Sequence, residues 1–226
     1  DDNYSKIKTI SNHLSSDVNK CKKSLNYLLD EDLKIFKVGE NLMRKFEFNH
    51  QNYQDLCYEK NHNNLLNKAH AESEFYFGSS SSLGMAAEVF NKKKFIINET
   101  DHLEVSQSTK LNNYIIFKKI FCSKSKEVIK INELFKRKLV FNEDILIALK
   151  NNEVYLEENS ENEIFEGLIE FYEHNYKNRK TNNLSNKEYF DMRNNYLIKN
   201  CNQPVNFHYK DYFFSIPESY LNKYLI

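Results

Sequence analysis

Residues 74–98 read EFYFGSSSSLGMAAEVFNKKKFIIN, and this stretch sets the architecture expected for the whole chain. It opens with an apolar run that ends at Gly78 and continues through a loop of four serines, residues 79–82. Small and apolar side chains at 83–90 are compatible with a helix, and residues 94–98 have the composition of a strand. The order strand, loop, helix, strand predicts a βαβ unit, and therefore a parallel sheet with a right-handed crossover.

Patterns on both sides of this unit extend the same α/β reading. Short apolar runs predict further strands at residues 33–38, 53–57, 114–117 and 154–156. Helical spacing predicts helices at residues 18–28, 61–71, 133–135, 143–149, 164–172 and 220–225, with Leu65, Leu66 and Ala69 facing inward in the second. Capping boxes are expected where Ser160 precedes Glu163 and where Ser215 precedes Glu218.

Composition narrows the class of protein. The 226 residues carry 32 basic and 32 acidic side chains, a balance that argues against a general nucleic-acid binder. No apolar run reaches the roughly 18 residues needed to span a bilayer, so no transmembrane segment is expected. The four cysteines lie far apart without metal-ligand spacing, which favours free thiols and gives no sign of a metal site or a cofactor.

The serine loop is the strongest candidate for binding chemistry. Ligands of open α/β sheets bind beyond the carboxyl ends of the strands, and backbone N–H groups at a helix N-terminus attract phosphate oxygens. Gly78 permits a sharp turn, the hydroxyls of residues 79–82 can donate to a phosphate, and Gly84 permits close approach. The candidate phosphate-binding residues are Gly78, Ser79, Ser80, Ser81, Ser82, Leu83 and Gly84. A solvent-facing polar loop remains the alternative.

Other side chains near strand ends are candidates for contacts with a nucleotide or sugar: Lys37, Gly39, Glu40, Glu88, Asn98, His102 and Lys118. Glu88 lies about two turns into the expected helix, where a carboxylate can accept hydrogen bonds from a ribose. His102 can contact a ligand or carry a proton, and Lys118 can neutralise phosphate. An ordinary surface or core role is the alternative for each. No catalytic residue can be assigned from these patterns.

The run Phe77 to Leu83, followed by residues 90–98, resembles a group of bacterial glycosyltransferases of the GT-B type. That group has a strand, a Gly-Thr/Ser-x-Ser-Gly-Leu loop, a helix, a Phe-x-Lys-Pro element and a strand that ends in asparagine. Four other stretches resemble it in the same order: residues 17–39, 117–119, 158–164 and 216–224. Ser82 and Lys93 depart from the group, which has glycine and proline there.

The resemblance implies the C-terminal, donor-binding half of a GT-B enzyme. Residues 1–173 would form a Rossmann-like sheet domain lacking its N-terminal start, and residues 174–226 a polar loop with a C-terminal helical extension. The segment at residues 1–4 resembles the opening of the second half in this group, which implies a missing N-terminal domain. The expected location is cytoplasmic, with peripheral attachment to the inner face of the membrane left open.

The implied activity is transfer of a sugar from a nucleotide-sugar donor to a hydroxyl of a glycan or lipid-linked acceptor, in the synthesis of a bacterial surface polysaccharide or glycoconjugate. GT-B enzymes typically manage this without a bound metal ion. Two alternatives remain open on the sequence. One is a polysaccharide pyruvyltransferase-like enzyme that uses a phosphoenol donor. The other is a non-catalytic α/β interaction module or a degenerate fragment.

Overall fold

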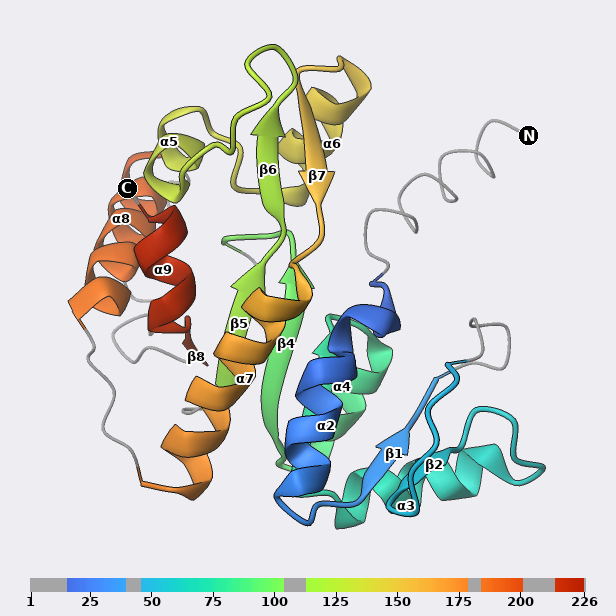
Figure 1. Cartoon of the computed structure of the whole chain (residues 1–226). Coiled ribbons are helices and arrows are strands. Elements are labelled where there is room, and N and C mark those ends of the chain that lie inside the picture. Colours follow the sequence, from blue (N-terminus) through green and yellow to red (C-terminus); the bar gives the residue numbers. More distant parts are fainter. Residues whose placement is uncertain (1–15, 40–45, 104–112, 179–183, 201–213, 226) are drawn as a thin grey trace.

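The computed structural model describes residues 16–39, 46–103, 113–178, 184–200 and 214–225. Its centre is a parallel sheet in the strand order β3-β4-β5-β8, flanked by helices (Figure 1). The strands of this sheet are β3 (Phe75–Ser79), β4 (Lys93–Glu99), β5 (Asn113–Phe117) and β8 (Phe214–Ser215). The expected α/β class, with a Rossmann-like parallel sheet and a C-terminal helix, is confirmed.

The remaining elements surround the sheet or extend from it. The helical elements are η1 (Val18–Cys21), α2 (Lys22–Asp30), α3 (His62–Glu72), α4 (Ser82–Val89), α5 (Ile131–Lys136), α6 (Asn142–Lys150), α7 (Glu161–Tyr176), α8 (Leu184–Asn200) and α9 (Glu218–Tyr224). A small parallel pair is formed by β1 (Ile35–Lys37) and β2 (Tyr53–Asp55). An antiparallel pair is formed by β6 (Lys119–Cys122) and β7 (Val154–Glu157), with α5 and α6 between them in the sequence. Among the described helices, none is both long and apolar enough to cross a bilayer.

The βαβ unit expected from residues 74–98 is present as β3-α4-β4. The two strands pair in parallel, with Phe75 opposite Lys93 and Ser79 opposite Ile97. Asn91 forms the turn before β4 with a φ of 59°, a left-handed conformation that asparagine tolerates better than most residues. The unit therefore places the serine loop and the end of β4 at the same edge of the sheet.

Successive residues of β4 contact helices on opposite faces of the sheet. Lys94 forms an ion pair with Glu88 of α4, whereas the ring of Phe95 stacks on Phe171 of α7. Because strand side chains alternate, α4 and α7 cover opposite faces. Strands β4 and β5 are buried on both sides, as the continuous apolar runs 95–97 and 114–117 require.

Helix α7 lies close to the sheet because its residue 167 is a glycine. A Cβ built there would lie 2.9 Å from Cζ of Phe95 and 3.1 Å from Cγ of Pro217. The helix begins with the expected capping box, in which the Ser160 hydroxyl accepts from the Glu163 N–H and the Glu163 carboxylate accepts from the Ser160 N–H. The helix is thus fixed both at its start and along its length.

Some local expectations are wrong. Ser215 lies in β8 and does not cap α9, whose N-cap is Pro217; the N–H groups of Glu218 and Ser219 donate instead to the Glu170 carboxylate of α7. In α3, Leu65, Leu66 and Ala69 lie on the less exposed side of the helix, as expected, although His70 is its only buried residue. The Glu170 carboxylate of α7 therefore takes the place of a local side-chain cap on α9.

The described part of residues 174–226 contains helices and a strand of the main sheet in addition to the expected loop and C-terminal helix. Helix α7 continues to Tyr176, α8 contacts α5 and α9, and β8 pairs with β5 as a strand of the main sheet. Cys21, Cys57 and Cys122 are free thiols, and Cys201 lies outside the described residues.

Candidate functional site

The carboxyl ends of β3, β4 and β5 lie at one edge of the main sheet. Ser79 ends β3, Glu99 ends β4 and Phe117 ends β5, and all three strands run in the same direction. This is the edge at which open α/β sheets bind ligands. We call it the carboxyl edge.

The serine loop at this edge is held by a tyrosine of its own strand. The Tyr76 hydroxyl donates to the Ser79 carbonyl oxygen at 3.0 Å and lies 3.3 Å from Oγ of Ser81. A Cβ at Gly78 would lie 2.7 Å from the same hydroxyl oxygen. The sharp turn expected at Gly78 is absent, because Gly78 lies within β3; its missing Cβ instead leaves room for the Tyr76 side chain.

The loop leads directly into the N-terminus of α4. Ser81 is the N-cap residue, and its side chain accepts no hydrogen bond from the first turn of the helix. Ser82 is exposed, Leu83 is half-buried and Gly84 is buried against the interior. Because N-terminal N–H groups carry partial positive charge, this helix start can attract an anion.

Glu99 is the principal residue of the carboxyl edge that the sequence patterns did not single out. Glu99 is 6% exposed, and its Oε1 accepts hydrogen bonds from the backbone N–H groups of Thr100 at 2.8 Å and Asp101 at 3.2 Å. The Ser80 side chain of the serine loop is near enough to this carboxylate to lower its pKa. Burial raises the pKa of Glu99, and these hydrogen bonds oppose the rise. An acidic residue directly after the buried run 95–98 was the signal that could have identified it.

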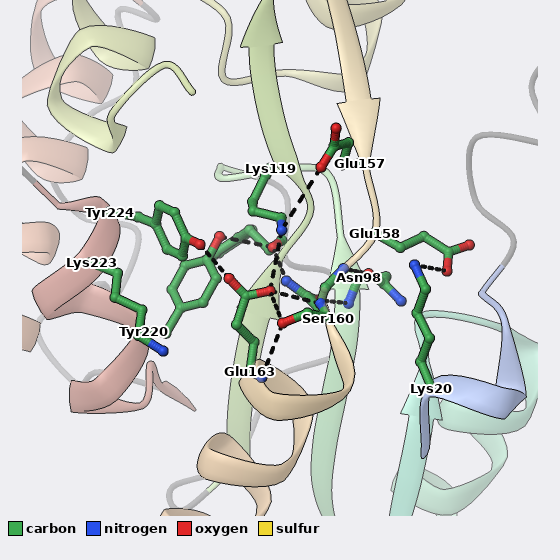
Figure 2. Close-up of polar contacts among 12 residues, drawn as sticks. Lys20, Asn98, Lys119, Glu157, Glu158, Ser160, Glu163, Tyr220, Lys223 and Tyr224 are labelled. Atoms are coloured by element: carbon green, nitrogen blue, oxygen red, sulfur yellow. Dashed lines mark hydrogen bonds and ion pairs between the residues drawn. The ribbon is translucent and has the colours of Figure 1, made fainter. Parts of the chain in front are cut away.

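Asn98 joins the end of β4 to the start of α7. Its side-chain oxygen accepts from the Asn159 N–H at 2.7 Å, and the Asn159 side-chain oxygen accepts from the Asn98 N–H at 2.9 Å. The Asn98 amide nitrogen donates to Ser16 Oγ, and the backbone is left-handed with a φ of 57°. Figure 2 shows Asn98 beside the start of α7. Its side chain is engaged in these contacts within the protein.

A second polar cluster lies around Glu163 at the start of α7 (Figure 2). The Glu163 carboxylate accepts from Ser160 and from the Tyr224 hydroxyl of α9, and lies 3.3 Å from Nζ of Lys119. Burial opposes its charge, but the hydrogen bonds from Tyr224 and Ser160 prevail and lower the pKa of Glu163. The N-terminus of α7 is thus already capped by a carboxylate of its own chain.

Lys118 follows β5 at the carboxyl edge and is buried. Its N–H donates to the Glu99 carbonyl oxygen at 2.7 Å, which ties the ends of β4 and β5 together. Burial lowers the pKa of the Lys118 ammonium, while the charge of Glu158 opposes this effect. Glu158 in turn forms an ion pair with Lys20 at 3.1 Å (Figure 2).

His102 is a core residue in this structure. Its ring stacks on Phe117 at a centroid distance of 4.0 Å, and its carbonyl oxygen accepts from the Tyr189 hydroxyl and from Nε of Arg193. Burial, assisted by the charge of Arg193, lowers the pKa of His102 to about 3. The cavity beside it measures about 10 Å³, which is about the volume of one water and too small for a sugar or nucleotide.

The structure places Lys37 in β1 of the small two-stranded sheet. Its ammonium lies 2.9 Å from Oδ2 of Asp55 and 3.3 Å from Sγ of Cys57. Burial opposes the charge of Lys37, but the hydrogen bonds prevail and raise its pKa. Gly39 is buried two residues later, and Glu40 lies outside the described residues. No hydrogen bond between the described residues joins this group to the main sheet's carboxyl edge.

Glu88 lies near the opposite, amino end of β4. Helix α4 runs antiparallel to the strands, so its last turn lies far from the serine loop. The Glu88 carboxylate bonds there with Lys94, whose side chain is fully buried. The structure therefore gives Glu88 a role in pairing a buried cation, and this position does not suit a contact with a ligand at the serine loop.

Three of the predicted parts of the site lie at the carboxyl edge: the serine loop, Asn98 and Lys118. Glu99 lies there as well, and its carbonyl oxygen accepts from the Lys118 N–H. Lys37, Glu88 and His102 are engaged elsewhere by other residues of the chain. Among the described residues, no group of three or more histidine, cysteine, aspartate or glutamate side chains is placed to hold a metal ion. Comparisons with protein-family models, curated proteins and solved structures found no match.

Proposed function

We propose that the chain binds a nucleotide-sugar donor at the carboxyl edge and serves as the donor-binding part of a glycosyltransferase. The observation that carries the proposal is the course of the serine loop. It leaves the carboxyl end of β3 and enters the N-terminus of α4 without a side-chain cap from Ser81. This arrangement offers backbone N–H groups and hydroxyls to a diphosphate. The resemblance of this loop to that of GT-B glycosyltransferases supports the same assignment.

In the proposed reaction, a hydroxyl of the acceptor attacks the anomeric carbon of the sugar. The bond from that carbon to the diphosphate oxygen breaks, and the nucleotide diphosphate leaves with the electron pair. The N–H groups at the start of α4 and the hydroxyls of Ser79 to Ser82 stabilise the developing negative charge. The base that accepts the acceptor's proton is not assigned to this chain. The proposal includes a glycan or lipid-linked acceptor and a second domain that holds it.

A binding panel tests this function. Calorimetric titration of the 226-residue chain with UDP-, GDP- and CMP-sugars, and separately with phosphoenolpyruvate, measures which donor class binds. We expect saturable binding of one nucleotide sugar. Ser81→Asp should weaken it at least about ten-fold, because a carboxylate within a few ångströms repels the phosphate.

The matched control is Ser125→Asp, which adds the same charge in the exposed turn that follows β6. It should leave the affinity unchanged. Binding of phosphoenolpyruvate alone would favour the pyruvyltransferase-like alternative. Failure of every compound to bind the folded chain would reject the donor site and favour an interaction module.

A further inference from the structure

We propose that Lys37 and Cys57 form a covalent crosslink through a single oxygen atom when the chain is exposed to dioxygen. The crosslink is a modification site in the small parallel pair of strands β1 and β2 (Figure 1). It goes beyond the proposed function, because neither side chain belongs to the carboxyl edge of the main sheet. The reaction needs a thiol, a primary amine and dioxygen, and the first two are already in contact.

The two reacting atoms lie close together. Nζ of Lys37 is 3.3 Å from Sγ of Cys57. The direct sulfur–nitrogen bond of a sulfenamide is about half as long, so that product would require a large shift of both side chains. An inserted oxygen atom spans most of the distance and requires only a small shift. The distance therefore favours an S–O–N bridge over a direct S–N bond.

The backbone fixes both side chains at their starting points. Lys37 lies opposite Asp55 in the register of β1 and β2, and the Leu56 N–H donates to the Lys37 carbonyl oxygen at 2.9 Å. The Cys57 N–H donates to Oδ1 of Asp55 at 3.0 Å. Because these contacts hold the two residues side by side, the bridge can form without rearrangement of the strands.

A carboxylate beside the amine can take up its proton. Oδ2 of Asp55 lies 2.9 Å from Nζ of Lys37, and the Asp55 side chain is 17% exposed, so a proton it receives can pass to solvent. The amine must be neutral to react. Burial opposes the charge of Lys37, but the hydrogen bonds to Asp55 and Cys57 prevail and raise its pKa. The neutral amine is therefore a minor form, and we expect slow crosslinking.

Cys57 differs from an ordinary buried cysteine because a lysine contacts its sulfur. The residue is 3% exposed, and burial raises the pKa of its thiol, as it does for unreactive structural cysteines. The hydrogen bond with Lys37 acts in the opposite direction and favours the thiolate. Burial also excludes bulky thiols that could form a mixed disulfide, whereas dioxygen is small and uncharged. The neighbouring amine is therefore the available reaction partner.

In the proposed reaction, the thiol, the neutral amine and one dioxygen molecule give the S–O–N bridge and one water. The S–H bond, one N–H bond and the O–O bond break. One oxygen forms bonds to sulfur and to nitrogen, and the other takes the two hydrogens and leaves as water. Sulfur and nitrogen each lose two electrons, and dioxygen accepts all four. Excess dithiothreitol can return these electrons and restore the thiol and the amine, with the bridging oxygen released as water.

The bridge would hold β1 against β2. It would add a covalent link where a hydrogen bond now joins the two side chains, and it would close the chain between Lys37 and Cys57 into a loop. A crosslink of this kind reduces the conformational freedom of the unfolded chain. The oxidised protein should therefore resist unfolding more strongly than the reduced protein.

Peptide mapping tests the crosslink directly. The 226-residue chain is kept for several days in dioxygen-saturated buffer or under argon, alkylated to block free thiols, and digested with trypsin. We expect a linked product only after dioxygen, joining residues 35–44, left uncleaved after Lys37, to residues 46–60. Its mass should exceed the sum of the two unmodified peptides by about 14 Da, for one oxygen gained and two hydrogens lost.

Two further treatments identify the bridging atom. Isotopically heavy dioxygen should raise the mass of the linked product by about 2 Da more, because the bridging oxygen comes from the gas. Dithiothreitol added before alkylation should abolish the product. A linked product lighter than the two peptides by about 2 Da would show a direct S–N bond and reject the oxygen bridge.

Variants assign the product to this pair. Lys37→Arg keeps a positive charge beside Asp55 but has no primary amine, and Cys57→Ser has no thiol; neither should give the linked product. Cys122→Ser is the matched control, because Cys122 is also a free thiol, and a backbone hydrogen bond from Ser125 is the main cause that lowers its pKa to about 7. This control should keep the linked product.

Thermal unfolding tests the effect on the strands. In Cys122→Ser, the crosslinked sample should unfold at a temperature a few degrees higher than the same sample after dithiothreitol. Equal midpoints would overturn the conclusion that the bridge holds β1 against β2.

The inference as a whole fails if residues 46–60 are recovered after dioxygen only as an unlinked peptide, whether Cys57 is a free thiol or a higher oxide. A linked product in folded Lys37→Arg would also overturn it. If Cys57→Ser fails to fold, peptide mapping of the wild-type chain together with Lys37→Arg still decides the question.

Discussion

The ammonium nitrogen of Lys94 lies 2.7 Å from Oε2 of Glu88, and this pair joins β4 to the last turn of α4. The Lys94 side chain is 0% exposed and that of Glu88 is 21% exposed. The cation is therefore surrounded by protein, and its partner carboxylate stands between it and solvent. This contact holds the C-terminal end of α4 against β4, and the serine loop leads into the N-terminal end of the same helix.

Glu88→Gln should destabilise the fold without affecting ligand selectivity. The substitution removes the carboxylate charge that pairs with the buried Lys94 ammonium, which costs about 3 kcal/mol of unfolding free energy. Urea denaturation measures this loss. The double variant Glu88→Gln/Lys94→Met should recover much of it, because the buried charge is then gone. A single variant as stable as wild type would show that the pair does not matter for folding.

His102 should make stability depend on pH. In the unfolded chain its imidazole takes up a proton near its ordinary pKa of 6.5, whereas in the folded chain the pKa is about 3. Its contribution is complete above pH 6.5 and is lost as the pH falls towards 3, at up to about 1.4 kcal/mol per pH unit. Urea denaturation at pH 7, 6 and 5 should give a flatter dependence for His102→Phe, which keeps a ring against Phe117. His62→Phe, in the first turn of α3, should retain the wild-type slope; identical slopes in all three proteins would contradict this prediction.

Gly167→Ala should destabilise the protein although alanine favours helices. The new Cβ would lie 2.9 Å from Cζ of the buried Phe95 ring. Overpacking of this kind costs about 1–3 kcal/mol and exceeds the gain of about 1 kcal/mol in helix propensity. A lower midpoint in thermal unfolding is the expected result. Combining the change with Phe95→Leu should cost less than the sum of the two single losses, and strict additivity would argue against the clash.

Glu99→Gln should raise stability at neutral pH by about 1 kcal/mol, a size typical of single substitutions. Burial raises the pKa of Glu99, so its ionised form opposes folding at neutral pH. The amide oxygen of glutamine can still accept from the Thr100 and Asp101 N–H groups. The advantage should shrink as the pH falls and Glu99 becomes protonated, which thermal unfolding at pH 7.5 and pH 5 can measure. A variant that is less stable at both pH values would show that the carboxylate supports the fold.

Much of the fold could be predicted because its signals are local. The strands β3, β4 and β5 and the helix α4 are predicted by apolar runs and small residues within residues 74–117, and the Ser160–Glu163 cap by a spacing of three. Helix α8, which buries Tyr189, Phe190 and Tyr196 among mostly polar residues, and the two-residue strand β8 were not predicted. Short strands depend on a neighbouring strand for their hydrogen bonds.

The candidate site was predicted only in part. The serine loop follows from its glycine and its place after a strand, but Glu88 and Glu99 look alike in the sequence. Their roles differ because α4 reverses the chain direction, which carries Glu88 to the amino end of β4 and leaves Glu99 at the carboxyl edge. His102 presents the same ambiguity, since nothing near it in sequence reveals that Tyr189 and Arg193 pack around it.

The sequence by itself determined the α/β class, the βαβ unit and the position of the serine loop, because these depend on periodicity and on interactions between residues close in the chain. The partners of its ionisable groups depended on the tertiary structure. Charges interact over a few ångströms of space regardless of separation in sequence. Which carboxylate pairs with Lys94 is therefore fixed only when α4 has packed against the sheet.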